Sequence, residues 1–201
     1  MDGYAPSPPK KPMQRRPLLI LPFAALAAPF GAQSQTPSAT AAPDVAGLLR
    51  TGRCVVMLRH AQTDPGIGDP PGFSLAQCSS QRNLSAQGRA QATAIGQWFR
   101  GNGLQPRQVL SSPWCRCKDT ADLAFGRHAV LPALASTFNA ATDGSQTLVL
   151  RDMLKTIPAG QFDVWVTHQV NITALSGGNP AMGEGFVLGP DARIQGRTLF
   201  A

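Results

Sequence analysis

Cys54-Val55-Val56-Met57-Leu58-Arg59-His60 is the stretch that decides the fold of this chain. Its first five residues are apolar, and Val55 and Val56 are β-branched, so the run is too short for a globular helix and suits a strand buried on both faces of a parallel sheet. Arg59 and His60 follow at the carboxyl end of that strand, the edge where open α/β sheets bind ligands. The pair combines a permanently charged anion clamp with a nucleophile or base. The alternative is that Arg59 and His60 are surface residues at a strand end. The rest of the sequence has to distinguish this interpretation from a functional site.

Strands and helices alternate in the sequence that follows. Ser85 is a good N-cap for a helix that stops at Gly101, and Pro113 starts another helix that ends at Gly126. The remaining expected elements are strands over 108–111, 129–131 and 162–167, a helix over 146–157, and two short strands within 185–200. This order predicts an α/β fold, a three-layer sandwich whose mostly parallel central sheet is flanked by helices and carries an antiparallel edge.

The amino-terminal part of the chain has the pattern of an export signal. Basic residues precede a short apolar core over 18–28 that ends in small residues, whereas a membrane span needs about twenty apolar residues. We therefore expect a signal peptide over 1–32, a flexible lead-in over 33–43 and a folded domain over 44–201. The expected location is periplasmic or secreted, with no stable membrane association after removal of the leader. An uncleaved anchor is the alternative.

The net charge of +7 does not indicate nucleic-acid binding. Residues 1–32 hold four basic residues and one acidic residue, which leaves fourteen basic and ten acidic residues in the remainder. No run of five Lys or Arg residues occurs, and aromatic residues make up 6% of the chain. The modest positive excess fits a small anionic substrate.

Two further strand ends carry side chains that can form one site with Arg59 and His60. Arg116 lies just inside the helix that follows the second strand, and His168 follows the strand over 162–167. If the three strands are parallel, all four side chains meet at one edge of the sheet. Arginine forks match phosphate oxygens in bidentate fashion, and the nearby helix N-terminus adds partial positive charge. The residues therefore predict a site for a phosphate dianion.

The motifs around these residues resemble those of the histidine phosphatase superfamily, which has the phosphoglycerate-mutase-like fold. They are, in the family's order, Leu58-Arg59-His60-Ala61-Gln62-Thr63, with Ala61 in place of the usual glycine; Asn83-Leu84-Ser85-x-x-Gly88-x-x-Gln91-Ala92; Ser111-Ser112-Pro113-x-x-Arg116-x-x-x-Thr120-Ala121; and Val166-Thr167-His168-Gln169. The resemblance covers residues 53–177. The compact body and the export signal make it similar to small exported bacterial members.

The resemblance implies a metal-independent phosphomonoester hydrolase that acts on a small phosphorylated substrate and needs no cofactor. His60 would form a phosphohistidine intermediate, while Arg59, Arg116 and His168 would stabilise charge on the transferred phosphoryl group. Thr63 and Gln169 are candidates for hydrogen bonds to the substrate. The alternatives are a phosphoglycerate-type mutase and a non-catalytic binder of phosphorylated ligands.

One part of the family pattern, the general acid, is left open by the sequence. Many members place a carboxylate after the third strand or directly after the second histidine, but here 134–139 has none and Gln169 follows His168. Asp143 and Asp64 are the nearest candidates for the general acid.

The four cysteines allow one specific expectation. In an oxidising compartment we expect a disulfide from Cys78 to Cys115 or Cys117, which flank Arg116, while Cys54 stays free in its buried strand.

Overall fold

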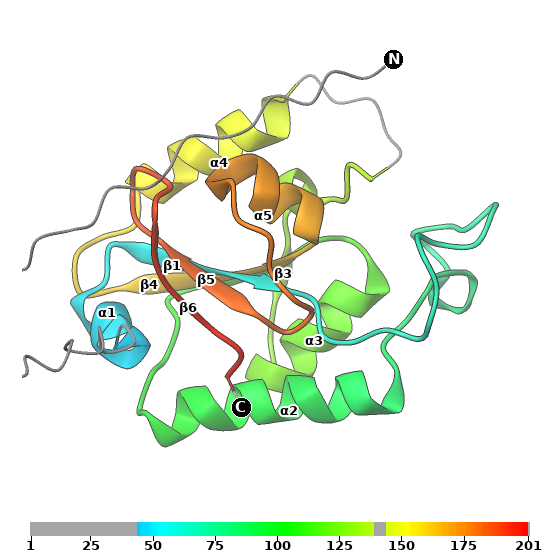
Figure 1. Ribbon diagram of the computed structural model, residues 1–201, viewed down its shortest axis with the longest axis horizontal. Helices are drawn as coiled ribbons and strands as arrows, with labels where there is room; N and C mark the ends of the chain where they lie inside the picture. The colour runs from blue at the N-terminus through cyan, green and yellow to red at the C-terminus, as the bar shows by residue number, and fades with distance from the viewer. Residues whose placement is uncertain (1–43, 139–143, 201) are drawn as a thin grey trace, which may run out of the picture. The chain divides into compact units, whose positions relative to one another are not determined.

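The strand β1, Cys54–Arg59, lies inside a six-stranded sheet between β4 and β5. The structure is a computed structural model that describes residues 44–138 and 144–200, all within one compact unit. In sheet order the strands are β3 (Ala129–Val130), β2 (Val109–Ser111), β4 (Phe162–Thr167), β1, β5 (Gly185–Leu188) and β6 (Ile194–Thr198). β1, β2, β3 and β4 are parallel, while β5 and β6 pair antiparallel at one edge (Figure 1). The predicted sheet and its antiparallel edge are confirmed.

Helices cover both faces of the sheet, as Figure 1 shows. On one side lie α1 (Val45–Thr51), α2 (Ala86–Gly101) and α3 (Cys115–Phe125), and on the other side lie α4 (Ser145–Lys155) and α5 (Gln169–Ser176). Two short 3₁₀ turns, Cys78–Ser80 and Pro132–Leu134, interrupt the connections. The three-layer α/β sandwich is therefore the observed architecture.

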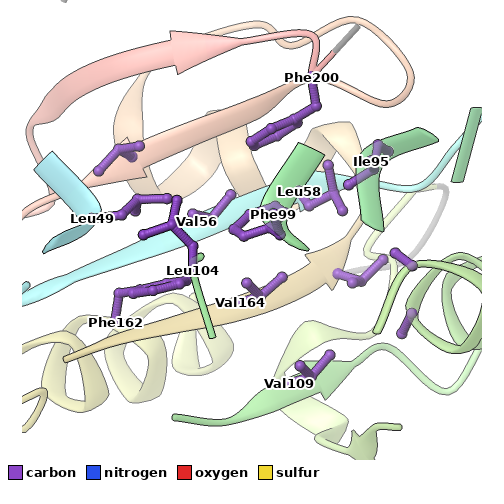
Figure 2. Packing of buried hydrophobic residues seen from close by; sticks show 14 of the residues in the cluster. Leu49, Val56, Leu58, Ile95, Phe99, Leu104, Val109, Phe162, Val164 and Phe200 are labelled. Atoms are coloured by element: carbon purple, nitrogen blue, oxygen red, sulfur yellow. The ribbon is translucent and has the colours of Figure 1, made fainter. Parts of the chain in front are cut away.

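β1 divides its side chains between two hydrophobic cores because successive residues of a strand point to opposite faces. Val56 and Leu58 pack with Phe99 of α2 on one face, as Figure 2 shows. Val55 and Met57 pack with the helices of the other face. All five apolar residues of β1 are fully buried, as a strand between two helical layers requires.

Two helices had no counterpart among the expected elements. α1 has seven residues and is capped by Asp44, whose Oδ1 accepts a hydrogen bond from the amide of Gly47 at 3.0 Å. α5 has eight residues and contains β-branched side chains at Val170, Ile172 and Thr173, which have a weak helix preference. Helices this short give little periodic signal, and tertiary packing decides their conformation.

The expected signal peptide and lead-in, and the candidate acid Asp143, lie outside the described residues. Within 44–138 and 144–200, no helix has the length and apolar character that a membrane crossing requires.

Candidate active site

The parallel pairing of β1 with β4 brings the two histidines together. Arg59 is paired with Thr167, so His60 and His168 are the first residues beyond the paired strands. The amide of His60 donates a hydrogen bond to the carbonyl of Thr167 at 3.0 Å. The imidazole ring centroids lie 5.5 Å apart at an interplanar angle of 67°. Both histidines are buried. The sheet edge at which the sequence predicts the site therefore forms the polar floor of a pocket.

Arg116 reaches the same point from the first turn of α3. Its Nη2 lies 3.4 Å from Nδ1 of His168, and its Nη1 donates to Oδ1 of Asp69 at 2.7 Å. The other carboxylate oxygen, Oδ2, accepts from Nε1 of Trp114 at 3.0 Å. The ion pair is almost fully buried, with side-chain exposures of 4% for Arg116 and 7% for Asp69. Asp69 thus fixes the orientation of the guanidinium.

A third guanidinium belongs to Arg82, which comes from the long connection between β1 and α2. Its Nε donates to the carbonyl of Gly68 at 2.8 Å, and its Nη1 donates to Oγ1 of Thr63. Burial and then the charge of Arg116 lower the pKa of the Arg82 guanidinium. Burial, Arg82 and Arg116 likewise lower the pKa of Arg59. The guanidiniums therefore repel one another and favour an anion between them.

The charge balance of the pocket fits a dianion. Among its described lining residues are three arginines, one carboxylate and two histidines. Burial raises the pKa of Asp69, but hydrogen bonds from Arg116 and the amide of Arg82 outweigh it and lower the pKa overall. With Asp69 ionised and both histidines neutral, the lining carries a net charge of +2.

The hydrogen bond of His60 determines which nitrogen is free. Nδ1 lies 2.9 Å from the carbonyl oxygen of Ala61, and a carbonyl can only accept, so Nδ1 carries the proton and Nε2 the lone pair. Burial, with further contributions from Arg116, Arg59 and Arg82, lowers the pKa of His60 to about 3. At neutral pH the ring is uncharged, and Nε2 is available as a nucleophile.

His168 has the opposite tautomer. Its Nδ1 faces Nη2 of Arg116, which can only donate, so the proton lies on Nε2 and is donated to Oγ of Ser112 at 2.8 Å. Burial, followed by the nearby His60 and Arg116, lowers its pKa well below the usual value. His168 is therefore neutral, and its Nδ1 accepts from Arg116 and helps to hold that guanidinium in place.

Two buried donors in this pocket point to an anionic ligand. Nε of Arg59 and Nε of Arg116 are inaccessible and have no hydrogen-bond partner among the residues that the structure describes. A buried charged donor without an acceptor is costly, and most such donors in proteins are paired. A phosphoryl group with several acceptor oxygens matches these donors.

The loop after His60 is held by residues of the second motif. Ser85 caps α2 through a hydrogen bond from the Gly88 amide at 3.0 Å, and a side chain at Gly88 would collide with the carbonyl of Gln62. Gln91 accepts from the Gln62 amide at 3.0 Å and donates to the carbonyl of Met182 at 3.0 Å. The motif thus positions the backbone beside the histidine.

Ala61, which replaces the usual glycine, fits its place in this loop. It is fully buried against Leu84 and Ala92. Its amide donates to Oγ1 of Thr120 at 3.0 Å, and that hydroxyl donates to the carbonyl of Arg116 at 2.7 Å. The departure from the motif therefore leaves the link between the His60 loop and α3 intact.

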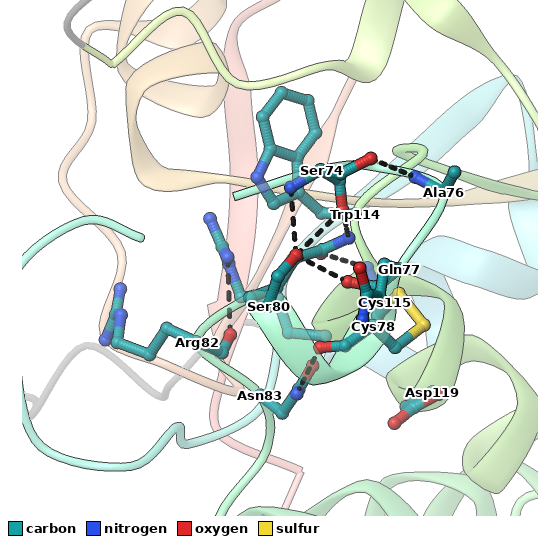
Figure 3. The surroundings of a disulfide bond; sticks show 12 residues. Ser74, Ala76, Gln77, Cys78, Ser80, Arg82, Asn83, Trp114, Cys115 and Asp119 are labelled. Atoms are coloured by element: carbon teal, nitrogen blue, oxygen red, sulfur yellow. Dashed lines mark hydrogen bonds between the residues drawn. A yellow bond between two sulfur atoms is a disulfide. The ribbon is translucent and has the colours of Figure 1, made fainter. Parts of the chain in front are cut away.

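A disulfide ties the long connection to the start of α3. Cys78 bonds to Cys115, the residue before Arg116, while Cys54 and Cys117 are free and buried. Figure 3 shows this bridge, with the side-chain amide of Asn83 donating to the carbonyl of Cys78 at 2.7 Å. One of the two expected pairings is thus confirmed, and so is the free Cys54.

The site residues predicted with less support are scattered. Gln169 lines the pocket at the start of α5. Thr63 lies behind Arg82 and donates to Sδ of Met182 at 3.8 Å. Asp64 is exposed and lines a neighbouring hollow with Thr63, not the pocket of His60.

Sequence reasoning missed Asp69 and Arg82 as members of the site. Asp69 lies in a segment rich in Gly, Pro and Asp, whose composition indicates a loop and assigns no residue to the pocket. Arg82 lies later in the same connection between β1 and α2. The signal that could have indicated Arg82 is its position directly before the Asn83-Leu84-Ser85 motif.

The pocket as a whole is a cavity of about 620 Å³ above the two histidines. In the described part of the chain there is no group of three or more His, Cys, Asp or Glu side chains that could hold a metal ion.

The depressed pKa of His60 predicts a pH-dependent stability. The folded state keeps this ring unprotonated down to about pH 3, whereas the unfolded chain binds a proton near pH 6.5. The free energy of unfolding should therefore fall as the pH drops below 6.5. Compared with His60→Gln, the native chain should lose about 1.4 kcal/mol more per pH unit in denaturant titrations between pH 6 and 4. Parallel pH profiles for the two proteins would contradict the assigned burial.

The disulfide should stabilise both the fold and the pocket. Its cysteines are 37 residues apart, and in the chain-entropy model a loop of this length contributes about 4 kcal/mol. The double variant Cys78→Ser/Cys115→Ser should show a correspondingly lower free energy of unfolding in urea. Reductant should lower the native midpoint to the same value and leave the double variant unchanged. Equal midpoints for the oxidised protein and the variant would refute this role.

Comparison with known proteins agrees with this geometry. Residues 55–137 match the family model of the histidine phosphatase superfamily (branch 1). No curated protein sequence matches the chain.

Several solved structures are similar to the chain. TTHB049 from Thermus thermophilus is 17% identical, with a TM-score of 0.52 over 72% of this chain and 98% of that chain. A proposed phosphohistidine phosphatase SixA from Agrobacterium tumefaciens is 20% identical, with a TM-score of 0.49 over 73% and 97%. The protein histidine phosphatase SixA complexed with tungstate is 16% identical, with a TM-score of 0.47 over 72% and 92%. The segment that carries Arg59, His60 and Arg116 thus matches the family model of the histidine phosphatase superfamily (branch 1), and the chain shares its fold with TTHB049.

Proposed function

We propose that this chain is a metal-independent phosphomonoester hydrolase that works through a phosphohistidine on His60. The observation that carries the proposal is the meeting of a neutral imidazole, whose Nε2 lone pair is free, with the guanidiniums of Arg59 and Arg116, whose buried Nε donors lack partners among the described residues. The match of residues 55–137 to the histidine phosphatase family model supports the same chemistry.

The reaction has two displacement steps. Nε2 of His60 attacks phosphorus, the N–P bond forms, and the ester P–O bond breaks with its electron pair leaving on the alcohol oxygen. Water then attacks the phosphohistidine, releases phosphate and restores the imidazole. Arg59 and Arg116 stabilise the charge that develops on the equatorial oxygens, and this preorganised stabilisation can contribute several kcal/mol.

The central prediction concerns His60→Ala. This change removes the covalent route, so turnover of a chromogenic phosphate ester should fall by several orders of magnitude while the arginines still bind phosphate. In rapid quench with a labelled ester, the native chain should carry label that is stable to alkali and labile to acid on His60. Full activity of the variant, or loss of native activity in chelator, would refute the mechanism.

A second variant, Arg116→Lys, tests the role of the guanidinium. It keeps the positive charge but loses the planar fork that contacts both Asp69 and His168, so it should also be strongly impaired. Assays with phosphoglycerates separate the alternatives, because a mutase transfers the group between positions and a non-catalytic binder releases no phosphate.

We also propose that the protein is exported and that the leader is removed. The basic and apolar pattern of residues 1–32 supports this, as does the Cys78–Cys115 disulfide, since such bonds persist in oxidising compartments. Intact-mass measurement of protein from the periplasmic fraction should show a start between about residues 28 and 35. Full-length protein confined to the cytoplasm would count against export.

A further inference from the structure

The mouth of the pocket is lined by large apolar side chains. Ile67, Phe73 and Phe138 are exposed by 91%, 36% and 47%, and all three line the same cavity as His60. Ile67 and Phe73 belong to the connection after β1, whereas Phe138 follows the 3₁₀ turn after β3. The backbone at Gly68 lies against the Phe138 ring, since a Cβ there would be 3.4 Å from its Cε1. Two separate segments thus present apolar groups at one opening, where exposed apolar surface indicates binding.

A series of ring contacts joins this mouth to the nucleophile. Beyond the 5.5 Å contact between His60 and His168, the centroid of Trp114 lies 5.2 Å from His168 at an angle of 78°. The centroid of Phe73 lies 6.0 Å from Trp114. One wall of the cavity is therefore aromatic from its floor to its rim. A flat aromatic group can pack against such a wall in offset or edge-to-face geometry.

The only carboxylate among the described residues that line the cavity has no proton to give. Asp69 accepts hydrogen bonds from Arg116 and Trp114 on its side-chain oxygens, and Oδ1 also accepts from the Arg82 amide at 3.0 Å. All these partners are donors, so the ionised form is the one that the pocket holds. A leaving oxygen in this cavity thus departs without help from a described carboxylic acid. A phenolate leaves far more readily than an alkoxide, because the pKa of a phenol is about 10 and that of an aliphatic alcohol is much higher.

We infer that the preferred substrates are aryl phosphomonoesters, whose aromatic leaving group packs between the aromatic wall at Trp114 and Phe73 and the apolar rim at Phe138. The inference rests on the proposed function, and it adds the class of leaving group. Nε2 of His60 bonds to phosphorus while the aryl P–O bond breaks, and the electron pair stays on the phenolate oxygen, which takes its proton from solvent. Water then cleaves the phosphohistidine.

The test is a substrate series with the exported protein, its Cys78–Cys115 disulfide intact. For substituted phenyl phosphates, kcat/KM should fall steeply as the pKa of the leaving phenol rises, and glycerol phosphate should be the poorest substrate. A phosphotyrosine peptide tested beside phenyl phosphate separates a protein-borne aryl ester from a free small one, and faster turnover of either than of glycerol phosphate supports the inference. Equal kcat/KM for alkyl and aryl esters would overturn it.

Variants of the wall and the rim locate the effect. Phe73→Ala and Phe138→Ala should each lower kcat/KM for naphthyl phosphate by about three- to tenfold, and leave inhibition by inorganic phosphate unchanged. Leu148→Ala is the matched control, because Leu148 is exposed by 63% on α4 and does not line this cavity. An unchanged preference for aryl esters in both phenylalanine variants would overturn the proposed contacts. Failure of the proposed function looks different, since then no ester is hydrolysed and no label reaches His60.

Discussion

The parallel pairing of β1 with β4 is the constraint on which the site depends. Its register places His60 and His168 at equivalent positions just beyond neighbouring strands, and the backbone hydrogen bond from His60 to Thr167 fixes the first of them. Both strands are buried on both faces, so a shift in register would disturb two hydrophobic cores at once. The energy that holds the catalytic edge therefore comes largely from apolar packing below it.

The electrostatics of the pocket follow from this burial. Three guanidiniums close together are unfavourable, and the structure relieves part of that repulsion through Asp69 and through neutral histidines. Asp69 occupies one side of the Arg116 fork and leaves Nε of the same guanidinium without a partner among the described residues. A buried pair of this kind adds little net stability by itself. Its value lies in orientation, because a guanidinium held in one position is preorganised for phosphoryl oxygens.

The connection between β1 and α2 completes the cavity. It supplies Asp69 and Arg82 near the floor and Ile67 and Phe73 at the mouth, although it has little regular structure. Such a segment needs anchors, and the Cys78–Cys115 disulfide together with the hydrogen bond from the Cys115 amide to Gln81 supplies them at its far end. The same disulfide lies next to Arg116. The same bond thus stabilises the fold and fixes the loop that lines the pocket.

The sequence by itself determined the order of the strands and of α2, α3 and α4, and the four residues at the strand ends, Arg59, His60, Arg116 and His168. These follow from local signals, namely short apolar runs, caps and motif spacing, which depend on neighbours along the chain. Only the tertiary structure decided that Asp69 and Arg82 also belong to the site. The connection that carries them has no periodic pattern from which its path across the sheet edge could be predicted. Only the tertiary structure chose between Cys115 and Cys117, which point to different sides of α3, the first toward Cys78 and the second toward His168. The protonation of both histidines was likewise decided in three dimensions, since it depends on burial and on which atoms face each ring nitrogen.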